Sequence, residues 1–149
     1  MYKIQTVITD ERLRQYPLVY QTSGAAGIDL RACIPEPLEL LPGMCLTISA
    51  GFRLHLKDPG LAAIILPRSG LGAKHGIILG NSVGLIDSDY TGEIMITPYN
   101  RSSQTFYLNP MDRIAQLVII PVLQVELQEV AEFRATRRGD GRLGSTGVK

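Results

Sequence analysis

The chain has 149 residues, 45% of them hydrophobic, and this length suits one domain with a sizeable core. Lysines and arginines number 15 against 14 aspartates and glutamates, a formal net charge of +1. This net charge is too small for the broad basic face of a nucleic-acid-binding protein, so we expect no nucleic-acid partner. Any anionic ligand must be bound by a few local cationic or hydrogen-bonding groups.

The N-terminus, MYKIQTVITDERLRQY, lacks the apolar core of a signal peptide, and no segment holds eighteen uninterrupted apolar residues. We therefore expect a soluble cytoplasmic protein with no membrane partner. Cys33 and Cys45 stand twelve positions apart, with no CxxC pair and no histidine cluster. This spacing favours free thiols over a disulfide framework or a zinc site.

Short apolar or alternating runs follow one another along the chain, separated by 15 glycines and 9 prolines. The prolines exclude long helices over most of the chain, and the runs predict an all-β sandwich or barrel. The triplets LPG and DPG predict turns that join antiparallel strands, and RSGLGAKHG has room for one helical turn. In chain order the expected strands are residues 3–8, 27–32, 38–41, 45–56, 61–67, 76–80, 84–88, 93–99, 104–108, 113–122 and 123–130.

The apolar pattern disappears from about Arg134 onward, where the sequence reads RATRRGDGRLGSTGVK. Such a segment cannot bury enough surface to fold alone. We therefore predict a β-rich catalytic domain over residues 1–133 and a flexible tail over 134–149, either disordered or ordered by what it binds.

Four short polar segments, which we call polar islands, interrupt the pattern of apolar strands. In SGAAGIDLRA, Asp29 breaks an apolar strand start, but this motif taken alone favours a tight turn feeding a strand. In PRSGLG, the guanidinium of Arg68, the hydroxyl of Ser69 and the exposed backbone at Gly70 suit phosphate oxygens. A plain loop remains the alternative there, because the Walker pattern GxxxxGK[ST] is absent.

A third island, NSVGLIDSDYTGEIM, spans residues 81–95 and carries Asp87, Asp89 and Glu93. An acidic hairpin turn is its simplest interpretation. Asp87, however, directly follows an apolar pair and so stands at a strand end, where a rigid scaffold can aim it. A calcium-binding EF-hand is excluded, because the twelfth position counted from Asp87 is Pro98 and no helices flank the segment.

The fourth island is RRGDGRLGSTG, residues 137–147. Its GxGxxG match lacks the strand and helix that a dinucleotide fingerprint needs, and RGD as an adhesion signal needs export. A solvated tail is one interpretation. The other is a strip of donors that folds around a polyphosphate, from Arg137, Arg138, Arg142, Ser145 and Thr146.

Together these islands, with RIAQLVI at 113–119, resemble the five ordered motifs of the trimeric dUTP diphosphatase (dUTPase) family along nearly the whole chain. The resemblance implies a jelly-roll-like β-clip subunit, a homotrimer, and active sites each built by more than one chain. It also implies hydrolysis of dUTP to dUMP and pyrophosphate with Mg²⁺. That reaction lowers dUTP and supplies dUMP for thymidylate synthesis.

By the same resemblance, Asp87 is the general base that activates a water for in-line attack on the α-phosphorus. Tyr90 lies flat against the deoxyribose and leaves no room for a 2′-hydroxyl. Asn81 pairs with the uracil edge, and its amide orientation selects uracil over cytosine. Backbone groups from Gly84 to Met95, with Leu85 among them, complete the base pocket.

The phosphate side follows from the other motifs. Asp29 meets magnesium through water, with the ion held mainly by the substrate phosphates. Leu143 stands where the family usually has a phenylalanine that stacks on uracil, so an aromatic contact is lost there. The residues that match phosphate-contacting positions are Arg68, Ser69, Gly70 and Gln116, closed over by Arg138, Ser145 and Thr146 from the tail.

Two other functions remain open from the sequence. A dCTP deaminase of the same fold also uses a deoxynucleoside triphosphate without zinc, but Tyr90 and the wording GLIDSDYTGE favour the diphosphatase. A non-catalytic jelly-roll binding module would have the same islands as solvated loops. Release of ammonia or of pyrophosphate separates the three.

Overall fold

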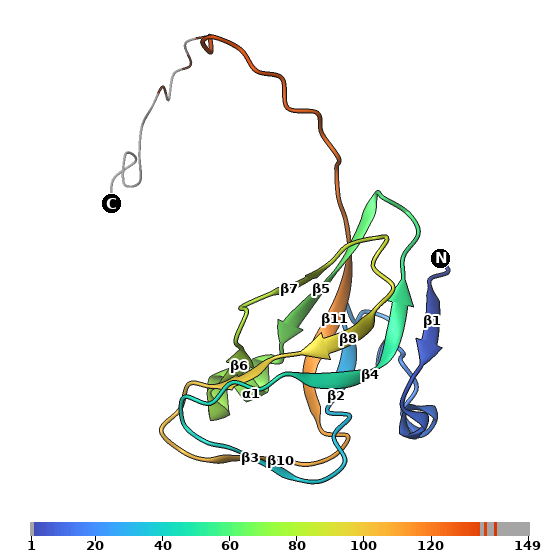
Figure 1. Ribbon diagram of the computed structural model, residues 1–149, viewed down its shortest axis with the longest axis vertical. Coiled ribbons are helices and arrows are strands. Elements are labelled where there is room, and N and C mark those ends of the chain that lie inside the picture. Colours follow the sequence, from blue (N-terminus) through green and yellow to red (C-terminus); the bar gives the residue numbers. More distant parts are fainter. Residues whose placement is uncertain (1, 135, 137–138, 140–149) are drawn as a thin grey trace.

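The computed structural model describes residues 2–134, 136 and 139. Two antiparallel sheets face each other across the core (Figure 1). The first sheet has the order β1 (Gln5–Ile8), β4 (Ile48–His55) and β8 (Glu93–Ile96). The second has the order β2 (Ile28–Arg31), β11 (Arg113–Pro121), β5 (Leu61–Pro67) and β7 (Gly84–Ile86).

Within the described residues, two small ribbons complete the β structure, and the helices are short. The ribbons pair β3 (Leu38–Leu40) with β10 (Phe106–Leu108), and β6 (Ile77–Leu79) with β9 (Pro98–Asn100). A 3₁₀ helix, η1 (Glu11–Gln15), follows β1, and α1 (Ser69–His75) joins β5 to β6. The expected all-β class is confirmed, and the helical turn expected at RSGLGAKHG is present as α1.

The core lies between the two sheets because their inward residues alternate with exposed ones. On β4, Phe52 and Leu54 are buried while Arg53 between them is exposed. They belong to one cluster with Ile65 of β5 and Leu117 of β11. Each fully buried side chain of this size contributes about 1.5–3 kcal/mol, so the sheets form a rigid base for the loops.

The LPG and DPG turns form, but they do not join paired strands. Met44 donates its N–H to Leu41 (2.9 Å) and Leu61 donates to Asp58 (2.9 Å), as β-turns require. β3 nevertheless pairs with β10, while β4 and β5 lie in different sheets. The expectation of antiparallel partners across these turns was therefore wrong. Turn residues specify a reversal of the chain, whereas strand pairing depends on the sheet into which the next strand packs.

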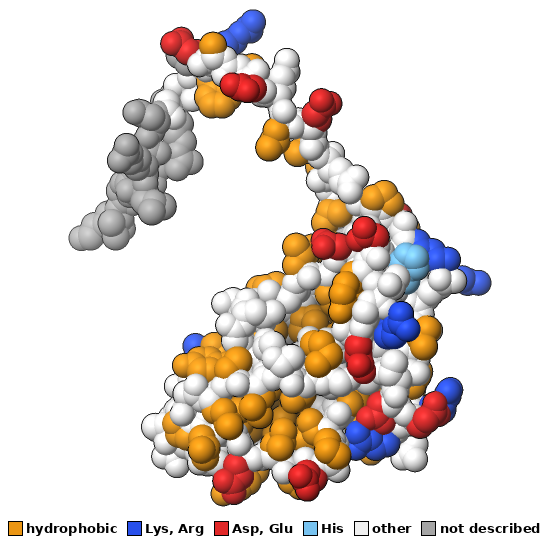
Figure 2. All heavy atoms as spheres, in the orientation of Figure 1, with side chains coloured by type: hydrophobic (Ala, Val, Ile, Leu, Met, Phe, Trp, Pro, Cys, Tyr) orange, Lys and Arg blue, Asp and Glu red, His pale blue; other side chains and the backbone are white. Residues whose placement is uncertain are grey.

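The last described segment, residues 122–134, leaves the body as an extended arm (Figure 1), which we call the C-terminal arm. Its start is tied down by the N–H of Val122, which donates to Gly60 (2.9 Å). Beyond that point apolar side chains are spaced along the arm in Figure 2, and Leu123 and Leu127 are 92% and 91% exposed. The strand expected over 123–130 does not form, because no strand in the described part of the chain pairs with it.

The packed body of the described chain thus ends near Val122. The division into a catalytic domain over 1–133 and a tail over 134–149 stays a prediction. Four expected site residues, Arg138, Leu143, Ser145 and Thr146, lie outside the described residues. Within the described part, no helix is long and apolar enough to cross a membrane.

Candidate functional site

A pocket of about 210 Å³ forms where β7, the following loop and β8 meet β5; we call it the Asp87 pocket. Four residues expected to contact substrate from this island, Asn81, Leu85, Tyr90 and Met95, line it together with Asp87. Apolar and polar side chains share the lining, which is Ile65, Asn81, Gly84, Leu85, Ile86, Asp87, Tyr90, Glu93, Ile94 and Met95.

Asp87 is exposed, yet the backbone on either side of it is fixed. Ile86, directly before it, is 8% exposed and pairs with Ala63 of the central strand β5. After it, the N–H of Tyr90 donates to the carbonyl of Asp87 (3.2 Å) and closes a turn. The carboxylate therefore stands on a strand end beside the tyrosine, as its sequence position predicted.

Tyr90 is held by two features of the next three residues. Its hydroxyl donates to the backbone carbonyl of Glu93 (2.9 Å). Gly92 lies under the ring, where an added Cβ would come within 2.5 Å of the tyrosine Cζ. The ring, 44% exposed, keeps this position only because residue 92 has no side chain. Gly92 was missed by the sequence reasoning, although its place two residues after an aromatic was a usable signal.

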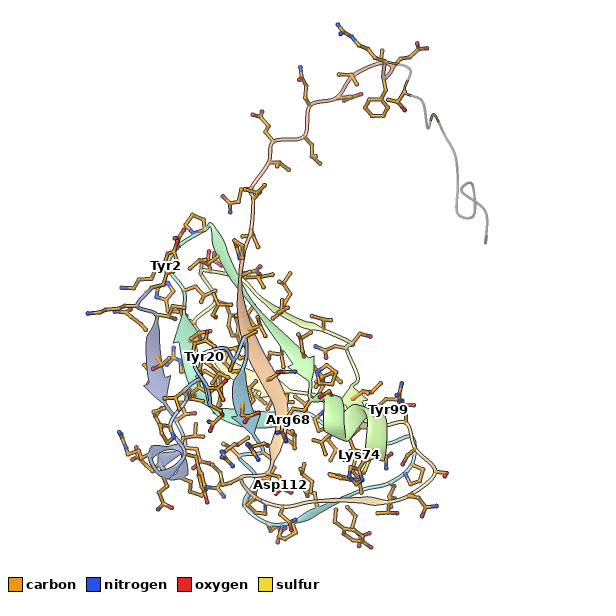
Figure 3. All side chains as sticks on the ribbon, turned by 180° about the vertical axis from the view of Figure 1, so that it is seen from behind. Tyr2, Tyr20, Arg68, Lys74, Tyr99 and Asp112 are labelled. Carbon is orange, nitrogen blue, oxygen red and sulfur yellow. The ribbon has the colours of Figure 1, made fainter. Side chains whose placement is uncertain are left out.

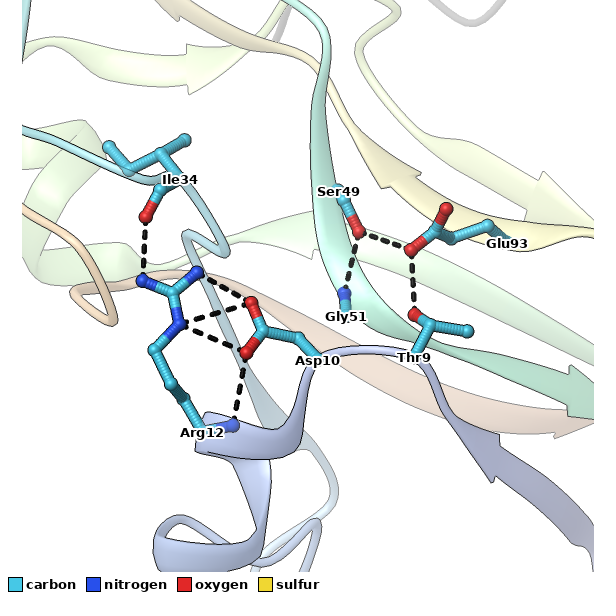
Figure 4. A network of polar contacts seen from close by, with 7 residues as sticks. All are labelled: Thr9, Asp10, Arg12, Ile34, Ser49, Gly51 and Glu93. Carbon is cyan, nitrogen blue, oxygen red and sulfur yellow. Dashed lines mark hydrogen bonds and ion pairs between the residues drawn. The ribbon is translucent and has the colours of Figure 1, made fainter.

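Glu93 joins the pocket wall to a polar network behind it (Figure 4). Its Oε1 accepts from Ser49 Oγ (2.6 Å) and from Thr9 Oγ1 (2.7 Å). These two hydrogen bonds, that of Ser49 first, hold the pKa of Glu93 below its ordinary value, so it stays ionised and cross-links β8 to β4 and to the end of β1. No sequence signal pointed to these partners, because Thr9 is 84 positions away.

The network continues into the N-terminal segment. Ser49 Oγ also accepts the N–H of Gly51 (2.8 Å), and the carbonyl of Gly51 accepts the N–H of Asp10 (3.0 Å). Arg12 then donates through its Nε to the Asp10 carboxylate (2.9 Å) and through NH1 to the carbonyl of Ile34 (2.8 Å). The guanidinium of Arg12 holds the pKa of Asp10 below its usual range. The wall of the Asp87 pocket is thus anchored to η1 as well as to the sheets.

A second pocket, of about 420 Å³, lies at the junction of β5 and α1; we call it the Arg68 pocket. Figure 3 shows Arg68 and Lys74 near α1. Five residues expected on the phosphate side are gathered here, together with Lys74 and His75, which the sequence reasoning did not name. The full lining is Asp29, Arg68, Ser69, Gly70, Leu71, Lys74, His75 and Gln116.

Asp29 in this pocket binds two arginines at once. Its Oδ1 lies 3.1 Å from Nε of Arg68 and its Oδ2 lies 3.2 Å from NH1 of Arg113. Arg68 also donates through NH1 to the backbone carbonyl of Arg113 (3.1 Å). The guanidinium of Arg68 is therefore oriented from two sides, and Arg113 is a further residue that the sequence reasoning missed.

Gln116 lies opposite Asp29 in the pairing of β11 with β2. Its Nε2 donates to the carbonyl of Pro67 (3.0 Å), which connects it to the residue before Arg68. A Cβ added at Gly27 would lie 2.8 Å from Gln116 Oε1, so the small residue in AGIDLRA is needed for close approach, as expected from its sequence.

The two pockets have no lining residue in common. Asp87, the expected base, lines one, and Arg68, the expected phosphate ligand, lines the other. In the described residues no group of three or more histidines, cysteines or carboxylates is arranged to hold a metal ion. The described part of one chain therefore presents two separate halves of the expected site.

A model of the dUTPase family matches residues 17–147. The chain belongs to the dUTPase family. Named relatives are similar in sequence to this chain over almost its entire length. The deoxyuridine 5′-triphosphate nucleotidohydrolase of Aromatoleum aromaticum is 56% identical over 147 residues, 99% of each chain. That of Paraburkholderia xenovorans is 56% identical over 145 residues, 97% of this chain and 98% of its own.

Solved dUTPase structures share the fold at lower identity. A Staphylococcus bacteriophage 80alpha dUTPase mutant with dUpNHpp superposes with a TM-score of 0.85 at 23% identity, over 99% of this chain and 100% of its own. A mutant dUTPase from phage phi11 of S. aureus, described with a structural Mg(II) ion, has a TM-score of 0.78 at 22% identity, over 90% of this chain and 100% of its own. The jelly-roll-like β fold expected from the sequence is confirmed by these dUTPases.

Proposed function

We propose that this member of the dUTPase family hydrolyses dUTP to dUMP and pyrophosphate. The observation that carries the proposal is the Asp87 pocket, in which Asn81, Asp87 and Tyr90 line one cavity on rigid strand ends. A carboxylate, an amide and an aromatic ring are the groups that water activation, base recognition and sugar recognition require. The family match does not favour dCTP deamination or a non-catalytic binding module.

In the proposed reaction Asp87 orients a water against the α-phosphorus and accepts its proton. The water oxygen bonds to that phosphorus while the bond to the oxygen bridging the α- and β-phosphates breaks, so pyrophosphate leaves in line with the attack. Asp87 is exposed beside the pocket, which leaves its carboxylate open to a water and a substrate. No covalent intermediate is needed, because phosphoryl transfer depends mainly on positioning and charge.

Selection of the nucleoside rests on the same pocket. The Tyr90 ring, held by Glu93 and by the space over Gly92, forms a flat wall for a deoxyribose and would collide with a 2′-hydroxyl. Asn81 would pair with the uracil edge, and backbone groups at Leu85 and Met95 would complete the contacts. Closure of this pocket around the base would leave no room for the thymine methyl.

The triphosphate would bind the Arg68 pocket. Arg68 has its guanidinium oriented by Asp29 and by the Arg113 carbonyl, which suits a forked contact to phosphate oxygens. Ser69, Gly70 and Gln116 would add donors, and Arg138, Ser145 and Thr146 of the tail would close over them, with Leu143 covering the base.

Asp29 fits a water-mediated contact to Mg²⁺ better than direct coordination, because each of its oxygens already binds an arginine. The ion would be held chiefly by the substrate phosphates, where it would neutralise charge. This arrangement agrees with a donor set of one arginine, one lysine, one serine and one glutamine rather than a carboxylate cage.

A homotrimer would bring the two pockets together. Asp87 and Arg68 line separate pockets in one chain, so a neighbouring subunit is the natural source of the other half. The C-terminal arm, with Leu123 and Leu127 almost fully exposed, needs an apolar partner.

Each chain has an apolar groove of about 700 Å³ between β1, β4 and β11. This groove could bind the C-terminal arm of another copy. Tyr2 and Tyr20, which line it, lie on the β1 side of the molecule (Figure 3). Exchange of arms between copies would satisfy both surfaces at once.

Pyrophosphate release from the purified chain tests the proposal. With Mg²⁺ present, dUTP should give equimolar dUMP and pyrophosphate, and UTP, dCTP and dTTP should react far more slowly. Ammonia release from dCTP would instead favour the deaminase, and no turnover of any nucleotide would favour a binding module.

A further inference from the structure

Thr97 lies in the short gap between β8 and β9, next to the loop that carries Asn81. Two hydrogen bonds connect them. The backbone N–H of Gly80 donates to the carbonyl of Thr97 (2.8 Å), and the hydroxyl of Thr97 donates to Oδ1 of Asn81 (2.8 Å). The first bond fixes the loop, and the second fixes the side-chain amide at its tip.

The second bond engages the oxygen end of the Asn81 amide. An amide has one acceptor end, the oxygen, and one donor end, the NH₂ group. Thr97 binds the oxygen, whereas the NH₂ group has no hydrogen-bond partner among the described residues, so the NH₂ group is the end that is free for new contacts in the Asp87 pocket. A base bound there has to present an acceptor to it.

We infer that Thr97 is a positioning residue for base specificity. By binding the oxygen of the Asn81 amide, it keeps the NH₂ group toward the base, so that uracil binds more tightly than cytosine. This inference rests on the proposed function. Uracil carries a keto oxygen at position 4, which accepts a hydrogen bond, whereas cytosine carries an amino group there, which donates. Two donors that face each other leave both unsatisfied, and this is costly.

Thr97 acts on the base only through Asn81, since it does not line the pocket. Its two bonds can be separated by substitution. Thr97→Val keeps the backbone carbonyl that binds Gly80 and keeps a β-branched shape, so the loop stays anchored while the hydroxyl is lost. Without that hydroxyl the amide is free to rotate and offer its oxygen to an amino group.

The test compares dUTP and dCTP hydrolysis in the full chain, with Thr97→Val against Thr97→Ser, which keeps the hydroxyl. In Thr97→Val the ratio of kcat/KM for dUTP to that for dCTP should fall about tenfold, as expected for one lost orienting hydrogen bond. In Thr97→Ser it should stay within about twofold of the parent value. The ratio of the affinities for the products dUMP and dCMP, measured by calorimetry, should change in the same direction, and this measurement needs no turnover.

A double-mutant cycle with Asn81→Ala separates specificity from a merely structural effect. If Thr97 acts through Asn81, Thr97→Val should not change the ratio further once the amide is gone. An unchanged ratio in Thr97→Val, or an equal fall in the Asn81→Ala background, overturns the inference. Should the valine variant not fold, a large fall in the ratio for Thr97→Ser overturns it too. Failure of the parent chain to hydrolyse dUTP refutes the proposed function itself, whereas parent activity with an unmoved ratio refutes only the role of Thr97.

Discussion

Asp29 and Arg68 form an ion pair between β2 and the end of β5, with 3.1 Å between Oδ1 and Nε. Their side chains are 17% and 32% exposed, so the pair is partly shielded from water but still open to the Arg68 pocket. Since Asp29 also binds Arg113, one carboxylate organises two cations beside the proposed phosphate site.

Asp29→Asn should therefore weaken substrate binding more than it weakens the fold. Loss of the charge releases Arg68 from its orientation, and KM for dUTP should rise about tenfold, the size expected for one charge-assisted contact. Steady-state kinetics and thermal unfolding measure the two effects. Asp58→Asn is the matched control, because Asp58 accepts from Gly60 (2.8 Å) in a turn outside both pockets. An unchanged KM in Asp29→Asn would show that Arg68 does not depend on this carboxylate.

Asp87→Asn should retain the fold and nucleotide binding but lose turnover. The amide is the same size but cannot accept the proton of the attacking water, so kcat should fall by about 10²-fold or more. Single-turnover kinetics with dUTP, together with calorimetry of a non-hydrolysable analogue, separate chemistry from binding. Asp89→Asn, two positions along the same turn but outside the pocket lining, should remain active. Near-normal turnover in Asp87→Asn would remove Asp87 from the role of base.

Leu127→Asp should disrupt the assembly without unfolding the chain. Leu127 is 91% exposed in the single chain, so a charge there costs little unless another copy covers it. Light scattering at micromolar concentration should report a trimer for the parent and a smaller species for this variant, with lower activity. Gln128→Asp adds the same charge at the neighbouring exposed position and should stay trimeric. A parent chain that is monomeric and active would contradict the proposed trimer.

Removal of all residues after Arg134 should separate catalysis from stability. The removed residues carry almost no apolar surface, so thermal unfolding should stay close to that of the full chain. Catalysis should fall strongly, because Arg138, Ser145 and Thr146 would no longer enclose the phosphates. Truncation after Gly147 leaves those residues in place and should have little effect. Equal rates of dUTP hydrolysis in the two truncated chains would mean that the tail does not close over the substrate.

Much of this protein could be predicted from residue order alone. Alternating apolar runs broken by glycine and proline specify short strands, because the side chains of a strand alternate between faces with a period of two. The position of Asp87 after an apolar pair predicted a carboxylate on a strand end, and the structure has it there. These features depend on neighbours within a few residues, which the sequence displays directly.

Only the tertiary structure decided which distant residues meet. The sequence gives no local signal for the pairing of β3 with β10, which are far apart along the chain. It gives none either for the bonds of Glu93 to Thr9 and Ser49, or for the bond from the hydroxyl of Thr97 to Asn81. The strand expected over 123–130 failed for the same reason, since a strand exists only where a partner offers its backbone hydrogen bonds. Local propensity is a property of the chain, whereas pairing and side-chain contact depend on how the whole core closes.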